Sequence, residues 1–128
     1  MFKKNKGHGR IDSLIGLGSS VQGDIQFAGG LRVDGQVVGN VQGLDDGALV
    51  VSEKARIEGK VSVSRLILNG EIAGPIEVSQ YVELQAQARV RGDVRYKTLE
   101  MQPGAVVEGR LLHLANGEHE EVTPSLMP

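Results

Sequence analysis

The chain has 128 residues, no Cys and no Trp, and a net charge of −2 from 14 basic and 16 acidic residues. The missing cysteines exclude a disulfide scaffold, a Cys-based zinc site and a thiol nucleophile, and the balanced charge argues against nucleic acid as a partner. Hydrophobic residues make up 40% of the chain, too many for a disordered protein, yet no apolar run reaches the ~20 residues that span a bilayer.

The chain opens on a basic segment. Residues 1–10 contain Lys3, Lys4, Lys6 and Arg10 and no acidic residue. No apolar stretch of about 7–15 residues follows the lysines, so the segment is not a secretory signal and we expect a cytoplasmic protein. Because residues 1–12 show no apolar periodicity, we expect them to form a disordered tail.

Residues 13–114 hold an internal repeat, which we expect to be one domain. Its core is a five-residue pattern: an aliphatic residue, any residue, Gly, any residue and a second aliphatic residue. Aliphatic pairs separated by one residue lie between the copies, as in Ile15/Leu17, Leu31/Val33 and Leu99/Met101, and a further pair such as Val61/Val63 follows most copies. This alternation is the signature of a half-buried strand. Six copies begin, 15 to 20 residues apart, at Val21, Val37, Ile57, Ile72, Val90 and Val107.

Three short strands per repeat predict an all-β fold, a parallel β-helix (solenoid) of about six coils. The repeated glycine marks one bend per coil, and Asp34-Gly35 and Asn69-Gly70 mark others. We expect stacked Val, Ile and Leu to fill an interior too narrow for large rings. The alternative, a β-sandwich, does not need Gly at one fixed point. The variable coil length favours a right-handed helix, since left-handed hexapeptide coils keep a strict multiple of six.

No group of residues indicates catalysis or ligand binding. His8 and His119 lie in polar segments and His113 near the end of the last coil, so a hexapeptide acyltransferase would lack its catalytic His in the coil body. Asp45-Asp46 lacks further calcium ligands, and Gly16–Ser20 lacks the Lys and helix of a phosphate loop. We therefore expect no enzyme activity, cofactor, metal or nucleotide.

The two ends of the repeat stay apolar. Residues 115–128 are acidic and contain Asn116-Gly117, Pro124 and Pro128, which oppose a helix, so we expect a second disordered tail and no cap. Uncovered strand edges are templates for another chain. The sequence thus predicts end-to-end assembly of copies of this chain through Leu14, Ile15 and Leu17 at one end and Leu111, Leu112 and Leu114 at the other.

The chain resembles the bactofilin family of bacterial cytoskeletal proteins. The matching segments are Ile11-Asp-Ser-Leu-Ile-Gly16, Val21-Gln-Gly-Asp-Ile25, Phe27-Ala-Gly-Gly-Leu-Arg-Val-Asp-Gly35 and Val38-Gly-Asn-Val41. The resemblance implies a right-handed β-helix with flexible tails and polymerisation without nucleotide. It also implies a scaffold for cell shape, polarity or the placement of envelope enzymes, with envelope or cell-wall proteins as partners.

The resemblance further implies membrane binding through a short N-terminal segment. Each Lys near an anionic leaflet contributes about 1 kcal/mol, and a filament that displays many copies would bind through avidity. The alternative for this segment is a solubilising tail. The alternative for the whole protein is a β-helical adaptor that does not polymerise. The residues of the expected membrane segment are Met1, Phe2, Lys3, Lys4 and Lys6.

Overall fold

The computed structural model describes residues 10–115 and 118–120, which contain strands and no helix. The long strands are β3 (Ile25–Val33), β5 (Val41–Val51), β7 (Val61–Leu68), β9 (Ile76–Leu84), β11 (Val94–Met101) and β13 (Leu111–Ala115). The short strands are β1 (Ser13–Ile15), β2 (Ser20–Gln22), β4 (Gln36–Val38), β6 (Arg56–Glu58), β8 (Glu71–Ala73), β10 (Arg89–Arg91), β12 (Val106–Glu108) and β14 (Glu118–Glu120).

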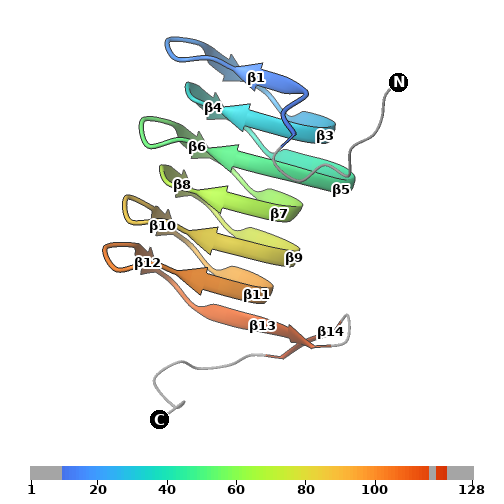
Figure 1. Ribbon diagram of the computed structural model, residues 1–128, viewed down its shortest axis with the longest axis vertical. Helices are drawn as coiled ribbons and strands as arrows, with labels where there is room; N and C mark the ends of the chain where they lie inside the picture. Colours follow the sequence, from blue (N-terminus) through green and yellow to red (C-terminus); the bar gives the residue numbers. More distant parts are fainter. Residues whose placement is uncertain (1–9, 116–117, 121–128) are drawn as a thin grey trace.

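The strands stack into two sheets that run along one axis (Figure 1). One sheet has the order β1-β3-β5-β7-β9-β11-β13-β14, and the other has the order β12-β10-β8-β6-β4-β2. Every pairing is parallel except that of β13 with β14. We call β1 with β2 coil 1, β3 with β4 coil 2, and so on to β11 with β12 as coil 6.

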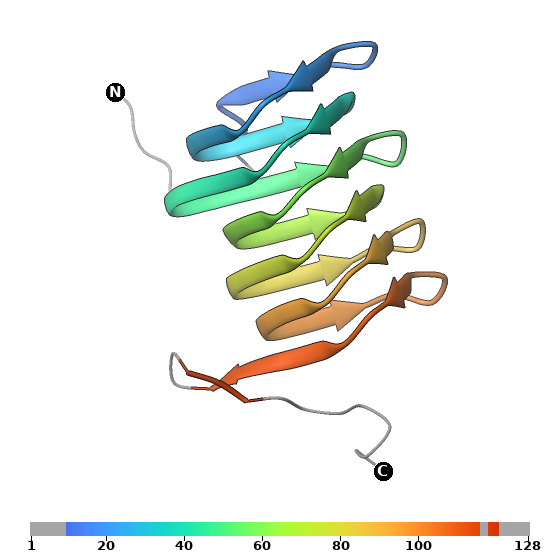
Figure 2. The same ribbon diagram turned by 180° about the vertical axis from the view of Figure 1, so that it is seen from behind.

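The solenoid is right-handed. In Figure 1 the long strands cross the front of the molecule from right to left, the chain returns behind them, and each turn lies below the previous one. Figure 2 shows the same return path from behind. The predicted all-β, parallel β-helix of about six coils is therefore confirmed.

The core consists of columns of aliphatic side chains. Pairing in register places Leu31, Leu49, Leu66 and Val82 above one another, each at most 3% exposed. Burial of such a side chain is worth about 1.5–3 kcal/mol. A second inward column, two residues further along each strand, is formed by Val33, Val51, Leu68 and Leu84.

Glycine forms one corner of every coil, as the repeat predicted. Gly39 has φ +151° and Gly59 has φ +148°, a conformation that side chains rarely adopt. A Cβ on Gly59 would also collide with the carbonyl oxygen of Gly39 in the coil above. Both the backbone angle and the stacking of the coils therefore require Gly at this corner.

Turns of two lengths form the opposite corner and account for part of the variation in coil length. Asp34-Gly35 and Asn69-Gly70 make two-residue corners. Four-residue corners are closed by a backbone N–H···O=C bond from the fourth residue to the first, of 2.9–3.1 Å. These longer corners are Gly16–Ser19, Ser52–Ala55, Gln85–Ala88 and Gln102–Ala105.

The ring of Phe27 lies in the interior, against our expectation that large rings would be excluded. Phe27 is 7% exposed and belongs to the core. Its partner in the coil below is Gly43, and a Cβ on Gly43 or Gly47 would press on the ring at 3.0 and 3.2 Å. The missing side chains of these two glycines leave the space that the ring fills.

The expected domain boundaries lie close to the ends of the described residues. The predicted tail of residues 1–12 lies outside them except for residues 10–12. The predicted tail of residues 115–128 differs from the structure in part, because β13 extends to Ala115 and β14 pairs antiparallel with it. The sequence indicated only that a helix was unfavourable there, and strand pairing of the backbone is compatible with that. The rest of this tail lies outside the described residues.

Candidate self-association surfaces at the ends of the solenoid

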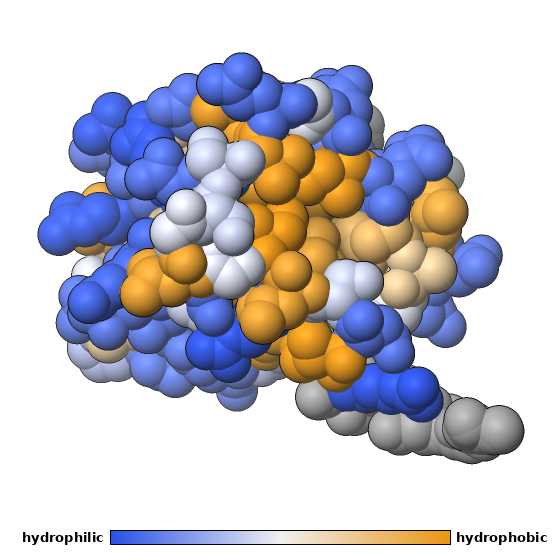
Figure 3. Space-filling view, turned by 90° about the horizontal axis from the view of Figure 1, so that it is seen from above, coloured by the Kyte–Doolittle hydropathy of each residue, from blue (hydrophilic) through white to orange (hydrophobic). Residues whose placement is uncertain are grey.

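The N-terminal end face is formed by β1, β2 and the first half of β3. β1 and β2 are the last strands of their sheets at this end, and within the described residues Ile25–Ala28 pairs with β5 alone. Figure 3 shows an apolar area in the middle of this end face. Ile15, Val21 and Ile25 contribute to it as partly buried side chains at the end of the core.

The three residues predicted for this end occupy different places. Ile15 pairs with Val33 and faces inward, whereas Leu14 pairs with Arg32, faces outward and is 59% exposed. Leu17 lies in the corner of coil 1 and is 71% exposed. The repeat predicted that Ile15 and Leu17 align with Leu31 and Val33. This is wrong by two residues: Ser13 and Ile15 pair with Leu31 and Val33, and Leu17 lies in the Gly16–Ser19 turn.

The C-terminal end face is formed by β12, the second half of β11 and β13. β12 is the last strand of its sheet, and Thr98–Met101 pairs with β9 alone in the described part of the chain. Leu99 and Val107 close the core as partly buried side chains, and Met101 is 45% exposed. This end therefore also presents strand edges beside the end of the aliphatic core.

The leucines predicted for this end lie on β13. Leu111 continues the inward column of Val94 and packs against the core. Leu112 is 2% exposed and is therefore buried within the subunit. Leu114 is half-buried and pairs through its backbone with His119 of β14. The role of all six predicted residues in a joint stays a prediction.

Leu99, Met101 and Val107 are end residues that the sequence does not predict. In the repeat, Leu99/Met101 is an ordinary inward pair and Val107 starts the sixth copy of the glycine pattern. No local sequence pattern marks these three residues as end residues, because their position depends on how far β13 follows β11. The parallel pairing of β13 with β11 covers only Val94–Tyr96, so the rest of coil 6 has no strand below it among the described residues.

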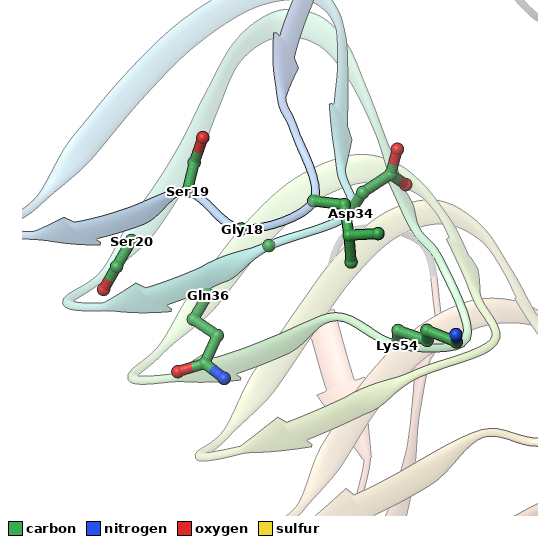
Figure 4. A pocket seen from close by; sticks show the side chains of 8 residues that line it. Gly18, Ser19, Ser20, Asp34, Gln36 and Lys54 are labelled. Atoms are coloured by element: carbon green, nitrogen blue, oxygen red, sulfur yellow. The ribbon is translucent and has the colours of Figure 1, made fainter.

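A shallow notch lies where the Gly16–Ser20 segment meets the next two coils (Figure 4). Gly18, Ser19 and Ser20 come from coil 1, Asp34 and Gln36 from coil 2, and Lys54 from coil 3. The carboxylate of Asp34 is already engaged, since it accepts hydrogen bonds from Ser52 Oγ and Arg32 Nε. These bonds lower the pKa of Asp34, the Ser52 bond most strongly.

Other chemistry-bearing residues also have structural surroundings. His113 faces inward, and its ring meets that of Tyr96 edge-on with centroids 5.6 Å apart. The backbone oxygen of Asp45 accepts a hydrogen bond from Ser64 Oγ at 2.9 Å. Residues 10–115 and 118–120 contain no group of three His, Asp or Glu side chains that could hold a metal ion.

The expected membrane segment, Met1–Lys6, lies outside the described residues. His8, the first of the three histidines, lies outside them as well. Among the residues that the structure does describe, no helix is long and apolar enough to cross a membrane.

Comparison with known proteins gives two matches. The sequence model of the family described as "Bactofilin: Polymer-forming cytoskeletal" matches residues 13–112. The structure is similar to that of a Thermus thermophilus bactofilin, solved as a cryo-EM reconstruction of double helical filaments. The sequences are 28% identical, the match covers 77% of this chain and 98% of that one, and the TM-score is 0.67. No curated protein matches the chain.

Proposed function

This chain belongs to the bactofilin family of polymer-forming cytoskeletal proteins, and we propose that it polymerises by joining the ends of its solenoid. The observation that carries the proposal is the pair of end faces, each with strand edges beside an apolar core end. A joint would pair these edges and bury the ends of the aliphatic columns. Both changes favour association, as in β-strand addition.

Assembly of this kind needs no nucleotide. Strand pairing and apolar burial supply the driving force, and the one glycine-rich loop that resembles a phosphate site is the corner of coil 1. Sedimentation of purified protein over a range of concentrations, without nucleotide, tests the proposal. We expect filaments above a threshold concentration and no change on adding ATP or GTP. Subunits that stay monomeric at every concentration would instead favour a non-polymerising adaptor.

We also propose that the filaments lie at the cytoplasmic face of a membrane. The support is the sequence of Met1–Lys6, with one aromatic residue and three lysines. Many weak contacts with anionic lipid add up along a filament. Co-sedimentation with vesicles of anionic lipid tests this, comparing the full chain with residues 8–128 and with a variant that carries Gln at Lys3, Lys4 and Lys6. Equal binding by all three would contradict it.

A filament at that position would act as a scaffold for cell shape, polarity or the placement of envelope and cell-wall proteins. The similar Thermus thermophilus protein forms double helical filaments, and we propose that filaments of this chain associate side by side as well. Electron microscopy of filaments assembled from the purified chain tests this: two strands per filament are expected, and single strands at every concentration would contradict it.

A further inference from the structure

One side of the solenoid, which we call the lateral face, is formed by β1 and by the second halves of β3, β5, β7, β9 and β11. In each of these strands one outward-facing residue lies between two inward-facing neighbours, as Val50 lies between Leu49 and Val51, which are at most 1% exposed. The strand register stacks these outward residues into one column. From coil 1 to coil 6 the column reads Leu14, Arg32, Val50, Ile67, Glu83 and Glu100.

The residue types along this column change in order from coil to coil. Its centre is aliphatic, with partly exposed Val50 and Ile67 in coils 3 and 4. A cation, Arg32, lies one coil above this centre, and an anion, Glu83, lies one coil below it. The arrangement is therefore charged on both sides of an apolar middle, with opposite signs.

The face formed by the short strands differs, because four of its charged residues pair within the subunit. Arg56 lies 3.1 Å from Glu71, and Arg91 lies 3.7 Å from Glu71 and 3.9 Å from Glu108. Glu58 and Glu71 raise the pKa of Arg56. These contacts pair Arg56, Arg91, Glu71 and Glu108 with one another inside the subunit.

On the lateral face, Glu83 and Arg32 have fewer partners of opposite charge within the described part of the subunit than Arg56 and Arg91 have. Glu83 accepts hydrogen bonds from the side-chain amides of Gln85 and Gln102, at 3.3 and 3.1 Å, and interacts with the hydroxyl of Tyr81. None of these three groups carries a positive charge. Arg32 bonds Asp34 through Nε, which leaves its terminal N–H groups as further donors, and its side chain is 47% exposed. Glu100, by contrast, already accepts a hydrogen bond from Tyr81 Oη at 2.6 Å.

We propose that the lateral face binds the lateral face of a second copy of this chain in antiparallel orientation. A two-fold axis between coils 3 and 4 exchanges coil 2 with coil 5 and coil 3 with coil 4. It therefore sets Val50 against Ile67 of the second copy, and Arg32 against its Glu83. The contact is isologous, so each pair occurs twice.

The size of the face indicates that filaments pair, whereas free subunits do not. Four residues of strand on each of six coils span roughly 13 by 29 Å, or about 400 Å² per subunit. A standard stable interface buries about 800 Å² per partner. Repetition along two filaments compensates for the weakness of each contact. This inference rests on the proposed function, since it requires filaments.

Charge reversal tests the pairing. We expect Arg32→Glu alone and Glu83→Arg alone to form single filaments by electron microscopy, because each brings two pairs of like charges together. A mixture of the two variants restores opposite charges at both positions in a mixed pair. We expect paired filaments to return in the mixture, with at least tenfold more pairs than in either variant alone.

The outcome separates the two proposals. Failure of the end-to-end proposal appears as wild-type protein without filaments of any kind. Failure of the lateral proposal appears as paired filaments that persist in Glu83→Arg, or as a mixture that stays unpaired. Arg32→Gln, which removes the charge without creating repulsion, serves as the control and is expected to pair more weakly than wild type and better than Arg32→Glu.

Discussion

The side-chain oxygen Oδ1 of Asn40 accepts the backbone N–H of Lys60 at 3.0 Å, although the two residues lie 20 positions apart in the sequence. Asn40 and Lys60 both directly follow the corner glycine of their coils. Asp24 holds the N–H of Asn40 in the same way at 3.0 Å, and Asp93 holds that of Arg110 at 2.9 Å. Pro75 occupies the equivalent place below Lys60, where no N–H needs an acceptor.

We predict that Asn40→Ala lowers the free energy of unfolding by about 0.5–1.5 kcal/mol, the usual net value of one hydrogen bond. The measurement is urea unfolding of subunits diluted below the assembly concentration. Lys60→Ala is the matched control, because its backbone N–H keeps its acceptor. Equal unfolding midpoints for the two variants would show that the Asn40 side chain does not hold the next coil.

We predict that Gly59→Ala destabilises the solenoid by about 2–4 kcal/mol, since it adds both backbone strain at φ +148° and a collision with the Gly39 carbonyl. Gly16→Ala is the control, because a Cβ at Gly16 meets nothing within 4 Å. Thermal unfolding followed by circular dichroism measures the difference. A Gly59→Ala protein that melts with wild type would mean that the coils do not stack at this corner.

The structure also predicts a pH dependence at the last complete corner. The pKa of the Asp93 carboxyl is lowered from 3.8, chiefly by hydrogen bonds from the side chain and backbone of Arg110. A lowered pKa in the folded state gives stability that is complete above pH 3.8 and is lost as the pH falls through the lowered value.

We therefore expect the Asp93 carboxyl to titrate below pH 3.8 in NMR spectra of the folded protein. Asp93→Asn removes the titrating group and keeps an oxygen for the Arg110 N–H, so the variant should lose less stability than wild type on acidification. A midpoint at or above 3.8 would contradict the described contacts of Asp93.

Much of the fold follows from local sequence. Inward pairs such as Leu49/Val51 and the corner glycines lie at nearly fixed intervals, and each coil is stacked on a neighbour of the same pattern. The alternation therefore determines both the strands and their register in coils 2–6. The right-handed winding was also predicted, from the variable spacing of the repeats.

The ends were predicted less well because a terminal coil has a neighbour on one side only. Leu17 continues the alternation of Ile15, yet the turn formed by the glycines around it places it in a corner. β13 leaves β11 after three residue pairs to join β14, and no local pattern indicates that change of partner. The exposure of Met101 follows from it, because no strand covers that part of β11 in the described residues.

The most direct test of end-to-end polymerisation compares Met101→Arg with Val38→Arg in a sedimentation assay without nucleotide. The two positions are 45% and 46% exposed, but Met101 lies on the C-terminal end face and Val38 on the side of coil 2. Met101→Arg would bury a guanidinium charge in the joint. If this burial weakens the free energy of association by about 3 kcal/mol, the protein concentration needed for assembly rises roughly a hundredfold. We expect Val38→Arg to assemble like wild type and Met101→Arg to stay in solution; equal assembly of both would contradict a joint at the C-terminal end face.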